Sequence, residues 1–124
     1  MNIYPDTNIL IYEIQTQFSL DEALLETVNP PYTVIILEAI HNELQELSKK
    51  KTKTGQAAKT ALHLIKQKDL KIKSTALIYG DQALLQHAAQ KDYVVTADKD
   101  LIKKLQDKNV QILTPRQKHT LLKR

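Results

Sequence analysis

Four carboxylic acids, spread over most of the chain, lie in phase with the apolar residues of helices that the sequence predicts. They are Asp6, Glu43, Asp81 and Asp98. Helical neighbours recur at i+3, i+4 and i+7, so Glu43 lies on the apolar stripe formed by Ile40 and Leu44. An ionised carboxylate on a buried face is costly unless a cation or strong hydrogen bonds compensate it. The pattern therefore predicts that the four acids meet around a common cation.

The chemistry that suits such a site is metal-assisted hydrolysis. Carboxylate oxygens without cysteine or paired histidine ligands favour Mg²⁺ or Mn²⁺, and these cations activate water and stabilise displacement at phosphorus. We therefore expect phosphodiester hydrolysis, with the four acids as metal ligands and catalytic residues. Taken singly, the three aspartates could equally be helix N-caps. Glu43 lies too far inside its helix to cap it, and its alternative role is a glutamate that reaches solvent from the edge of the stripe.

Three small polar residues and one further acid accompany these carboxylates. Thr7, Asn8 and Thr96 could orient a carboxylate or bind the scissile phosphate, and helix capping explains them equally well. Asp100 lies roughly 200° around the helix from Asp98, so we expect Asp100 to have only an accessory role.

The other titratable side chains show no pattern for catalysis. Glu38 and Glu46 lie off the centre of the apolar stripe of their helix and are expected to be solvated. No pair of histidines has metal-ligand spacing, and nothing in the chain indicates a serine or cysteine nucleophile. We interpret the histidines as surface or packing residues: His41, His63, His87 and His119.

A basic segment, residues 48–55, follows the helix that carries Glu43. Its lysines are Lys49, Lys50, Lys51 and Lys53. Such a run is usually a solvated loop, but beside an acidic metal site it could hold the phosphate backbone of RNA. The net charge of +4 also leans towards a polyanionic partner. With five Tyr, one Phe and no Trp, no base-stacking platform is visible, so phosphate contacts are expected to dominate.

Strands and helices that alternate along the chain are expected to position these groups. Apolar and β-branched runs predict strands at 2–5, 32–37, 70–75, 93–96 and 110–113. Apolar residues at helical spacing predict helices at 7–17, 20–28, 38–47, 56–68, 80–90 and 98–107. Pro115 is expected to stop the last strand and leave a basic tail over residues 115–124. This alternation favours an α/β fold in which helices cover both faces of a parallel sheet.

Length and composition limit what else the chain could be. With 124 residues, 42% apolar and 26% charged, we expect one globular domain over residues 1–124. The absence of cysteine excludes disulfides and thiolate metal sites. With only two glycines, the chain contains neither GxGxxG nor a P-loop. Because no membrane-spanning apolar run and no signal-peptide pattern are found, we expect a cytoplasmic location and no membrane partner.

Four motifs in order along the chain resemble those of the PIN-domain ribonucleases. They are Pro5-Asp6-Thr7-Asn8-Ile9-Leu10, Ile40-x-x-Glu43-Leu44, Asp81-x-Ala83-Leu84-Leu85 and Thr96-Ala97-Asp98-x-Asp100-Leu101. The resemblance covers nearly the whole chain, and it implies a three-layer α/β/α fold with a four- to five-stranded parallel sheet in the order 3-2-1-4-5. It also implies cleavage of single-stranded RNA by an Mg²⁺- or Mn²⁺-binding tetrad. On that resemblance the tetrad is the set of four acids named above, with Thr7, Asn8 and Thr96 as polar helpers.

Within this family two branches compete for the chain. The basic segment, the helix after it and the tail at Arg116, Gln117 and Lys118 resemble the small-subunit rRNA-processing nucleases of archaea and eukaryotes, which we favour here. The second branch is the VapC-type toxins, which cleave tRNA, rRNA or mRNA and are silenced by a protein antitoxin. The implied partners are RNA with a ribosome-assembly factor, or RNA with an antitoxin and a second copy of the chain as a homodimer. One departure is Glu38, where relatives commonly have proline or a small residue.

Two functions of other kinds stay open at this point. A non-catalytic RNA-binding module would keep the fold and bind RNA without turnover, and its binding would be indifferent to EDTA and to Asp98→Asn. A structure-specific DNA nuclease would use the same metal chemistry, but the usual helical arch of such enzymes is absent from so short a chain. The complete acidic set favours a metal-dependent endoribonuclease over both.

Overall fold

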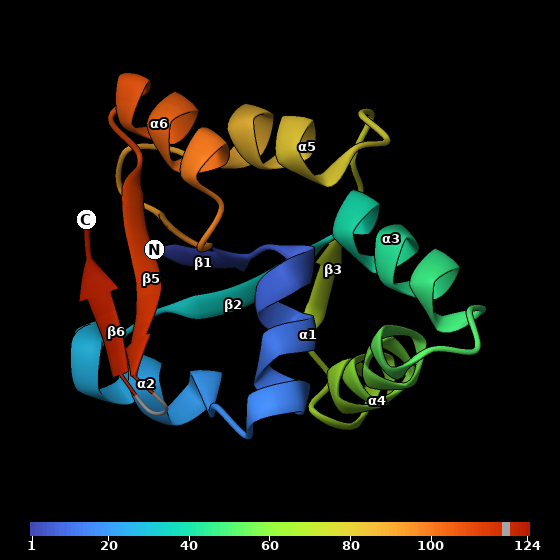
Figure 1. The fold of residues 1–124 in the computed structure, drawn as a ribbon. Helices are drawn as coiled ribbons and strands as arrows, with labels where there is room; N and C mark the ends of the chain where they lie inside the picture. Colours follow the sequence, from blue (N-terminus) through green and yellow to red (C-terminus); the bar gives the residue numbers. More distant parts are fainter. Residues whose placement is uncertain (118–119) are drawn as a thin grey trace.

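A sheet with helices on both faces organises the computed structural model, which describes residues 1–117 and 120–124 (Figure 1). The strands are β1 (Asn2–Pro5), β2 (Thr33–Leu37), β3 (Lys71–Lys73), β4 (Tyr93–Val95), β5 (Gln111–Gln117) and β6 (Thr120–Lys123). They form a six-stranded sheet in the order β3-β2-β1-β4-β5-β6. The pairs within β3-β2-β1-β4-β5 are parallel, so the predicted α/β fold and the order 3-2-1-4-5 are confirmed.

Six helices connect these strands among the described residues. They are α1 (Thr7–Thr16), α2 (Leu20–Thr27), α3 (Glu38–Ser48), α4 (Lys53–Gln67), α5 (Gly80–His87) and α6 (Lys99–Asp107). In Figure 1, α5 and α6 lie over one face of the sheet and α1 and α2 over the other, while α3 and α4 pack beside the β2–β3 edge. None of these helices has both the length and the apolarity needed to cross a membrane.

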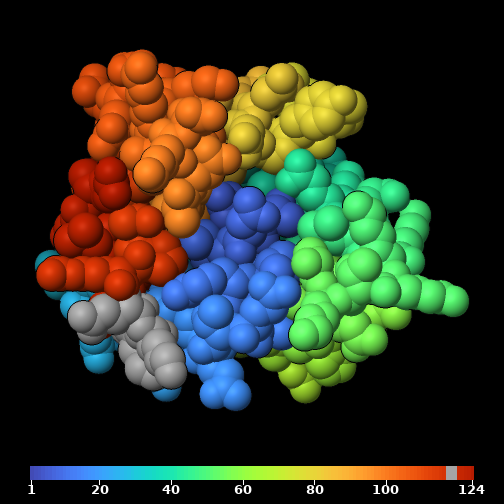
Figure 2. Space-filling model, in the orientation of Figure 1, coloured from blue at the N-terminus to red at the C-terminus, as the bar shows by residue number. Residues whose placement is uncertain are grey.

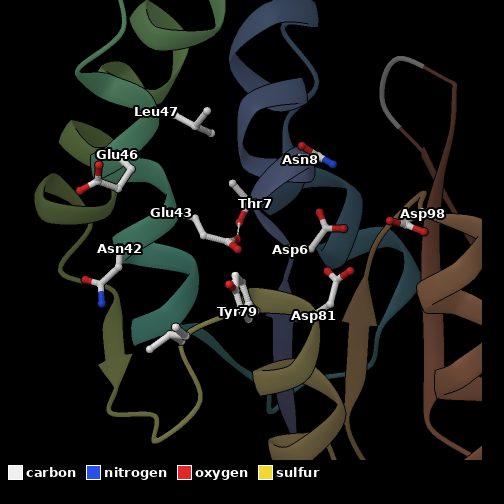
Figure 3. A pocket seen from close by; sticks show the side chains of 11 residues that line it. Asp6, Thr7, Asn8, Asn42, Glu43, Glu46, Leu47, Tyr79, Asp81 and Asp98 are labelled. Carbon is white, nitrogen blue, oxygen red and sulfur yellow. Dashed lines mark hydrogen bonds between the residues drawn. The ribbon is translucent and has the colours of Figure 1, made fainter.

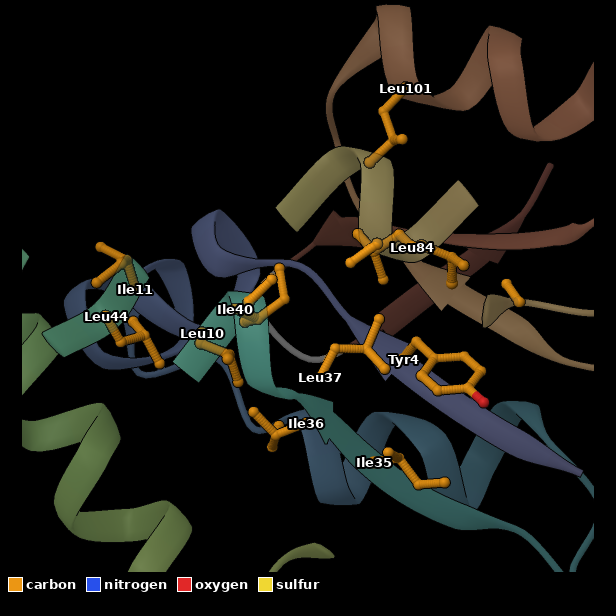
Figure 4. Packing of buried hydrophobic residues seen from close by; sticks show 14 of the residues in the cluster. Tyr4, Leu10, Ile11, Ile35, Ile36, Leu37, Ile40, Leu44, Leu84 and Leu101 are labelled. Atoms are coloured by element: carbon orange, nitrogen blue, oxygen red, sulfur yellow. The ribbon is translucent and has the colours of Figure 1, made fainter. Parts of the chain in front are cut away.

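The alternation of side chains along the central strands separates two apolar cores. Ile3 packs in the core that contains Phe18 and Leu24, whereas its neighbour Tyr4 packs in the larger core with Leu84, because successive strand residues point to opposite faces. Figure 4 shows the larger core between β1, β2 and the covering helices. Both faces of β1 are buried, so this strand is fixed in the middle of the sheet and its carboxyl end cannot shift relative to its neighbours.

The C-terminal segment differs from the sequence prediction. Residues 115–124 were expected to be a basic tail, but β5 continues through Pro115 and pairs antiparallel with β6. Pro115 is tolerated because β4 pairs with β5 only as far as Leu113 and because the β5–β6 register is irregular next to it, which is where strands accept proline. Lys118 and His119, which the sequence analysis also discussed, lie outside the described residues.

Two further element boundaries were predicted wrongly. The helix expected to reach residue 90 ends at His87, because the buried Asp92 carboxylate accepts hydrogen bonds from the Ala89 and Asn2 backbone N–H groups and organises the following loop. The basic segment is half helical: α3 reaches Ser48, α4 begins at Lys53, and only residues 49–52 lie between the two helices.

Candidate active site

A cavity of about 530 Å³ opens at the carboxyl ends of the parallel strands, next to β1 (Figure 3). This edge is where open α/β sheets bind their ligands. Its lining comes from the start of α1, the second half of α3, the segment that leads into α5, and the residue that caps α6: Asp6, Thr7, Asn8, Asn42, Glu43, Glu46, Leu47, Ile78, Tyr79, Asp81 and Asp98. All four carboxylates singled out in the sequence therefore meet in one cavity.

Asp6 is the most deeply placed of these acids, with only 4% of its surface exposed. Its Oδ1 accepts a hydrogen bond of 2.8 Å from the Ile9 N–H, and its Oδ2 accepts one from the Thr96 hydroxyl. Asp6 is thus the N-cap of α1 and a cavity-lining acid at once. Its pKa is raised to about 6, chiefly by burial, with the charges of Asp81 and Asp98 adding to the rise and the two hydrogen bonds opposing it.

The Thr96 hydroxyl joins two of the acids. It donates to Asp6 and accepts a hydrogen bond of 3.1 Å from the Asp98 N–H. Asp98 in turn caps α6, because its Oδ1 accepts from the N–H groups of Asp100 and Leu101 at 2.9 and 3.1 Å. This buried hydroxyl therefore fixes the start of α6 relative to the start of α1.

Glu43 connects three elements that are distant in sequence. Its Oε1 accepts a hydrogen bond of 2.5 Å from the Thr7 hydroxyl of α1, and its Oε2 accepts one of 3.1 Å from the Gly80 N–H of α5. The alternative in which Glu43 merely reaches solvent from the edge of α3 is therefore wrong. Both bonds orient the carboxylate towards the cavity, as Figure 3 shows.

Asp81 lies in the first turn of α5, and Tyr79 is the N-cap of that helix. The capping alternative for Asp81 is therefore wrong, and its side chain is exposed to the cavity. Burial raises its pKa, the charges of Asp98 and Glu43 add to this, and Lys104 opposes it. Because the charges of Asp98 and Glu43 raise the pKa of Asp81, the negative charges of these acids lie close enough to repel.

The donor set of the cavity fits a hard divalent cation. Among residues 1–117 and 120–124, its lining includes five carboxylates and no lysine, arginine or histidine, so no described side chain of the lining neutralises the repulsion. Such oxygen ligands suit Mg²⁺ or Mn²⁺. No three acidic or histidine side chains in the described ranges, 1–117 and 120–124, are already arranged as an ion-binding group, so the acids would have to adjust their rotamers around an ion.

Several predicted residues lie elsewhere. The side chain of Asp100 is exposed and does not line the cavity; only its N–H takes part, as a donor to Asp98. Lys49 forms an exposed ion pair of 2.9 Å with Glu46. The other three predicted lysines line a second cavity of about 690 Å³ between α1 and α4: Lys50, Lys51 and Lys53.

Of the two glutamates expected to be solvated, Glu46 is exposed as expected and Glu38 is not. Glu38 begins α3 and is half-buried, because its carboxylate accepts a hydrogen bond of 3.2 Å from the Thr75 N–H. Glu46 is exposed but also lines the cavity. Glu46 lies three residues after Glu43 and one turn after Asn42 on α3. Its spacing from Glu43 could have predicted that it lines the same cavity, because residues three or four apart share a helix face.

One wall of the cavity consists of residues that were not predicted from the sequence. This wall consists of Asn42, Leu47, Ile78 and Tyr79. Leu47 follows Glu43 by four residues and so lies on the same face of α3. Ile78 and Tyr79 had no such signal, because they precede α5 and only the fold brings them to the site.

The chain is similar to a described protein family and to a curated ribonuclease. The model described as "PIN like domain" matches residues 3–118. Ribonuclease VapC4 of Methanocaldococcus jannaschii is 33% identical over 119 residues, which cover 94% of this chain and 91% of the relative.

Solved structures with the same fold include an endonuclease domain and a chain of a VapBC complex. The PIN domain endonuclease Utp24 superimposes with a TM-score of 0.79 at 20% identity, covering 98% of this chain and 90% of Utp24. VapBC2 from Rickettsia felis, solved with a DNA fragment from its promoter, gives a TM-score of 0.63 at 24% identity, covering 92% of this chain and 98% of that chain.

Proposed function

The chain belongs to the PIN-like domain family, and from this premise we propose that it is a metal-dependent endoribonuclease that cleaves single-stranded RNA. The observation that carries the proposal is the convergence of Asp6, Glu43, Asp81 and Asp98 in one cavity, which no basic side chain lines in the part of the chain that the structure describes. A relative named as a ribonuclease, 33% identical over 94% of this chain, supports the same activity.

The four acids divide two tasks between them in this proposal. Asp6, Asp81 and Asp98 hold Mg²⁺ or Mn²⁺, which when bound lowers the pKa of water and neutralises charge on the scissile phosphate. Glu43 orients the attacking water, since the Thr7 hydroxyl and the Gly80 N–H already fix its carboxylate.

Two polar residues assist the acids. Thr96 positions Asp6 and Asp98 together through its hydroxyl. Asn8 lies on the cavity wall where it can donate to a phosphate oxygen.

Lysines beside the cavity supply affinity for the RNA backbone. Lys50, Lys51 and Lys53 line the second cavity together with Ile14 and Gln15 of α1, about 10 Å along that helix from Thr7 at 1.5 Å per residue. Figure 2 shows the green surface of the α3–α4 junction next to the blue surface of α1. Positive groups at this position attract phosphates without reading sequence.

Of the two branches of the family, we place the VapC-type ribonucleases first for this chain. The curated relative supports this order, although the sequence features alone favoured rRNA processing. The likeness to Utp24 keeps rRNA processing as the second candidate, because its TM-score of 0.79 exceeds the 0.63 of the VapBC2 chain. In the first branch the protein partner is an antitoxin and a homodimer is expected; in the second it is a ribosome-assembly factor. A cleavage panel of tRNA, mRNA and rRNA fragments separates the two.

The decisive experiment is cleavage of a single-stranded RNA in Mn²⁺ by the wild type and by Asp6→Asn. We expect the substitution to lower kcat at least about 100-fold, since the loss of one charged group that acts in the transition state costs about 3 kcal/mol or more. Asp107→Asn, at the exposed end of α6, is the matched control and should cleave normally. Equal activity of Asp6→Asn and wild type would refute the proposal, and EDTA-insensitive RNA binding without cleavage would favour the non-catalytic module.

A further inference from the structure

We propose that Tyr79, with Ile78 and Leu47, forms a nucleobase subsite in which an unpaired base next to the scissile phosphate stacks on the tyrosine ring. This inference rests on the proposed function and adds to it a residue that selects single-stranded RNA. Tyr79 and Ile78 line the same cavity as the four acids. The subsite is therefore within one nucleotide of the proposed chemistry.

The exposure of these two side chains is unusual for the molecule. Among the described residues, the large apolar side chains with the highest exposed fractions are Ile78 at 74%, Leu25 at 70% and Tyr79 at 61%. Two of the three are thus adjacent in sequence and lie on the rim of one cavity. Apolar surface gathered beside a polar site marks a place where a ligand binds.

The segment that carries Tyr79 is held in place at both ends. The Thr75 N–H donates to the Glu38 carboxylate at 3.2 Å, and the Gly80 N–H donates to Glu43 at 3.1 Å. The Thr75 hydroxyl also donates to the Leu77 carbonyl at 3.0 Å. Glu38 and Glu43 both belong to α3, so this helix fixes the backbone that carries the aromatic ring. A backbone that is already in position loses little entropy when a base stacks on the ring.

Gly80 explains how Tyr79 comes so close to the catalytic acid. A Cβ atom at this position would lie 2.6 Å from Glu43 Oε1 and 2.6 Å from Ile40 Cδ1. The glycine therefore lets the backbone after Tyr79 contact the Glu43 carboxylate directly. Figure 3 shows Tyr79 beside Glu43 and Asp81 in the cavity.

The chemistry of the cavity walls matches a nucleotide rather than a protein chain. One wall carries Asp6, Asp81 and Asp98 and suits a cation-bound phosphate. The opposite wall combines apolar side chains with the Asn42 amide and with the Glu46 carboxylate, which pairs with Lys49. A nucleobase has apolar faces and a polar edge, and proteins bind unpaired bases by stacking them on aromatic rings while amides bond the edge. In a duplex the base is already stacked, so this subsite favours single strands.

Binding should be measured in the Asp6→Asn background, so that turnover does not consume the probe. The probes are a fluorescein-labelled ten-nucleotide oligouridylate and an abasic strand with the same phosphates. We expect Asp6→Asn to bind the oligouridylate about 10-fold more tightly than the abasic strand, because one base stacked on an aromatic ring increases the affinity by about this factor. Adding Tyr79→Ala should remove this preference, while Tyr79→Phe, which keeps the ring, should retain it.

Leu25→Ala is the matched control, because it removes an equally exposed apolar side chain from α2 and should leave the preference unchanged. In the cleavage assay Tyr79→Ala should raise KM more than it lowers kcat. If Tyr79→Ala keeps the full preference for the oligouridylate, the subsite is refuted and the exposed pair is left for a protein partner. If the wild type cleaves no RNA but Tyr79→Ala still removes the preference, the subsite is upheld and only the proposed enzyme activity is refuted.

Discussion

Asp6 performs two tasks that oppose each other energetically. Its carboxylate caps α1 through the Ile9 N–H, which stabilises the fold. Burial and the neighbouring acids raise its pKa to about 6, so the ionised form that a metal requires destabilises the fold when no cation is present. A site built for function, and not for stability, accounts for this conflict.

This conflict predicts a pH-dependent gain of stability in Asp6→Asn. An aspartate whose pKa is raised in the folded state binds its proton more tightly there, so the free energy of unfolding falls as pH rises from about 4 to about 6. At pH 3, well below the ordinary aspartate pKa of 3.8, Asp6 is mostly protonated in both states and the penalty is nearly absent. In EDTA at pH 7.5 we expect Asp6→Asn to be more stable than wild type by about 1–3 kcal/mol, and the difference should nearly vanish at pH 3.

Urea denaturation at both pH values measures this difference. Asp107→Asn should show no such gain, because its side chain is exposed at the end of α6. Addition of Mn²⁺ at pH 7.5 should stabilise the wild type and stabilise Asp6→Asn much less. A variant less stable than the wild type at pH 7.5 would mean that capping by the charged carboxylate outweighs its burial.

Helix α3 is the element on which the site depends. It supplies Glu43, Leu47 and Asn42 to the cavity, and its Glu38 carboxylate holds the segment before α5. Glu38 was noted in the sequence as a departure from the family and as expected to be solvated. Its hydrogen bond to Thr75 gives it a structural task instead.

The close approach of α5 to α3 predicts a selective loss of activity in Gly80→Ala. The added Cβ would displace the Glu43 carboxylate, which the Thr7 hydroxyl holds from the other side. We expect kcat to fall about 10-fold or more, since misplacing a catalytic group by about 1 Å is costly, while stability changes by at most about 2 kcal/mol.

Gln82→Ala, at an exposed position two residues further along α5, is the control and should cleave RNA normally. Steady-state kinetics and thermal unfolding of both variants provide the comparison. Full activity in Gly80→Ala would show that cleavage does not depend on the position of the Glu43 carboxylate, and it would remove Glu43 from the proposed mechanism.

Acidic side chains line one cavity of the molecule, and lysines line an adjoining cavity. The acidic cavity lies at the start of α1, and the cavity lined by Lys50, Lys51 and Lys53 lies along the second half of the same helix. A single strand of RNA that crosses both would place phosphates on the lysines and one phosphate among the acids. Affinity and chemistry would then reside in different cavities.

This division predicts that the lysines affect binding and not the chemical step. Replacement of Lys50, Lys51 or Lys53 by glutamine should weaken RNA binding and reduce the slope of log K against log salt by about 0.7 per lost phosphate contact, with kcat unchanged. Titration of a single-stranded RNA with the Asp6→Asn protein at several KCl concentrations measures the slope. Lys91→Gln is the control, because Lys91 precedes β4 and therefore lies at the opposite, amino end of the parallel strands. Equal slopes in all variants would place the RNA elsewhere.

The sequence by itself determined the class of fold and the four acids that meet. Helical phase and alternation follow from local geometry, so the positions of Asp6, Glu43, Asp81 and Asp98 on their helices could be predicted without a structure. Local geometry misled at Pro115, where only pairing with β6 shows that the strand continues. It placed Asp100 roughly 200° around the helix from Asp98, and the Asp100 side chain lies outside the cavity.

Only the tertiary structure decided which residues complete the site. The bond from Thr96 to Asp6 spans 90 positions of the sequence, and that from Gly80 to Glu43 spans 37. Such contacts depend on how β1 and β4 pair and on how α5 packs against α3, and no local pattern encodes either. Tyr79 carried no signal in the sequence, because its role arises from the loop that the Glu38 and Glu43 carboxylates of α3 hold at the rim of the acidic cavity.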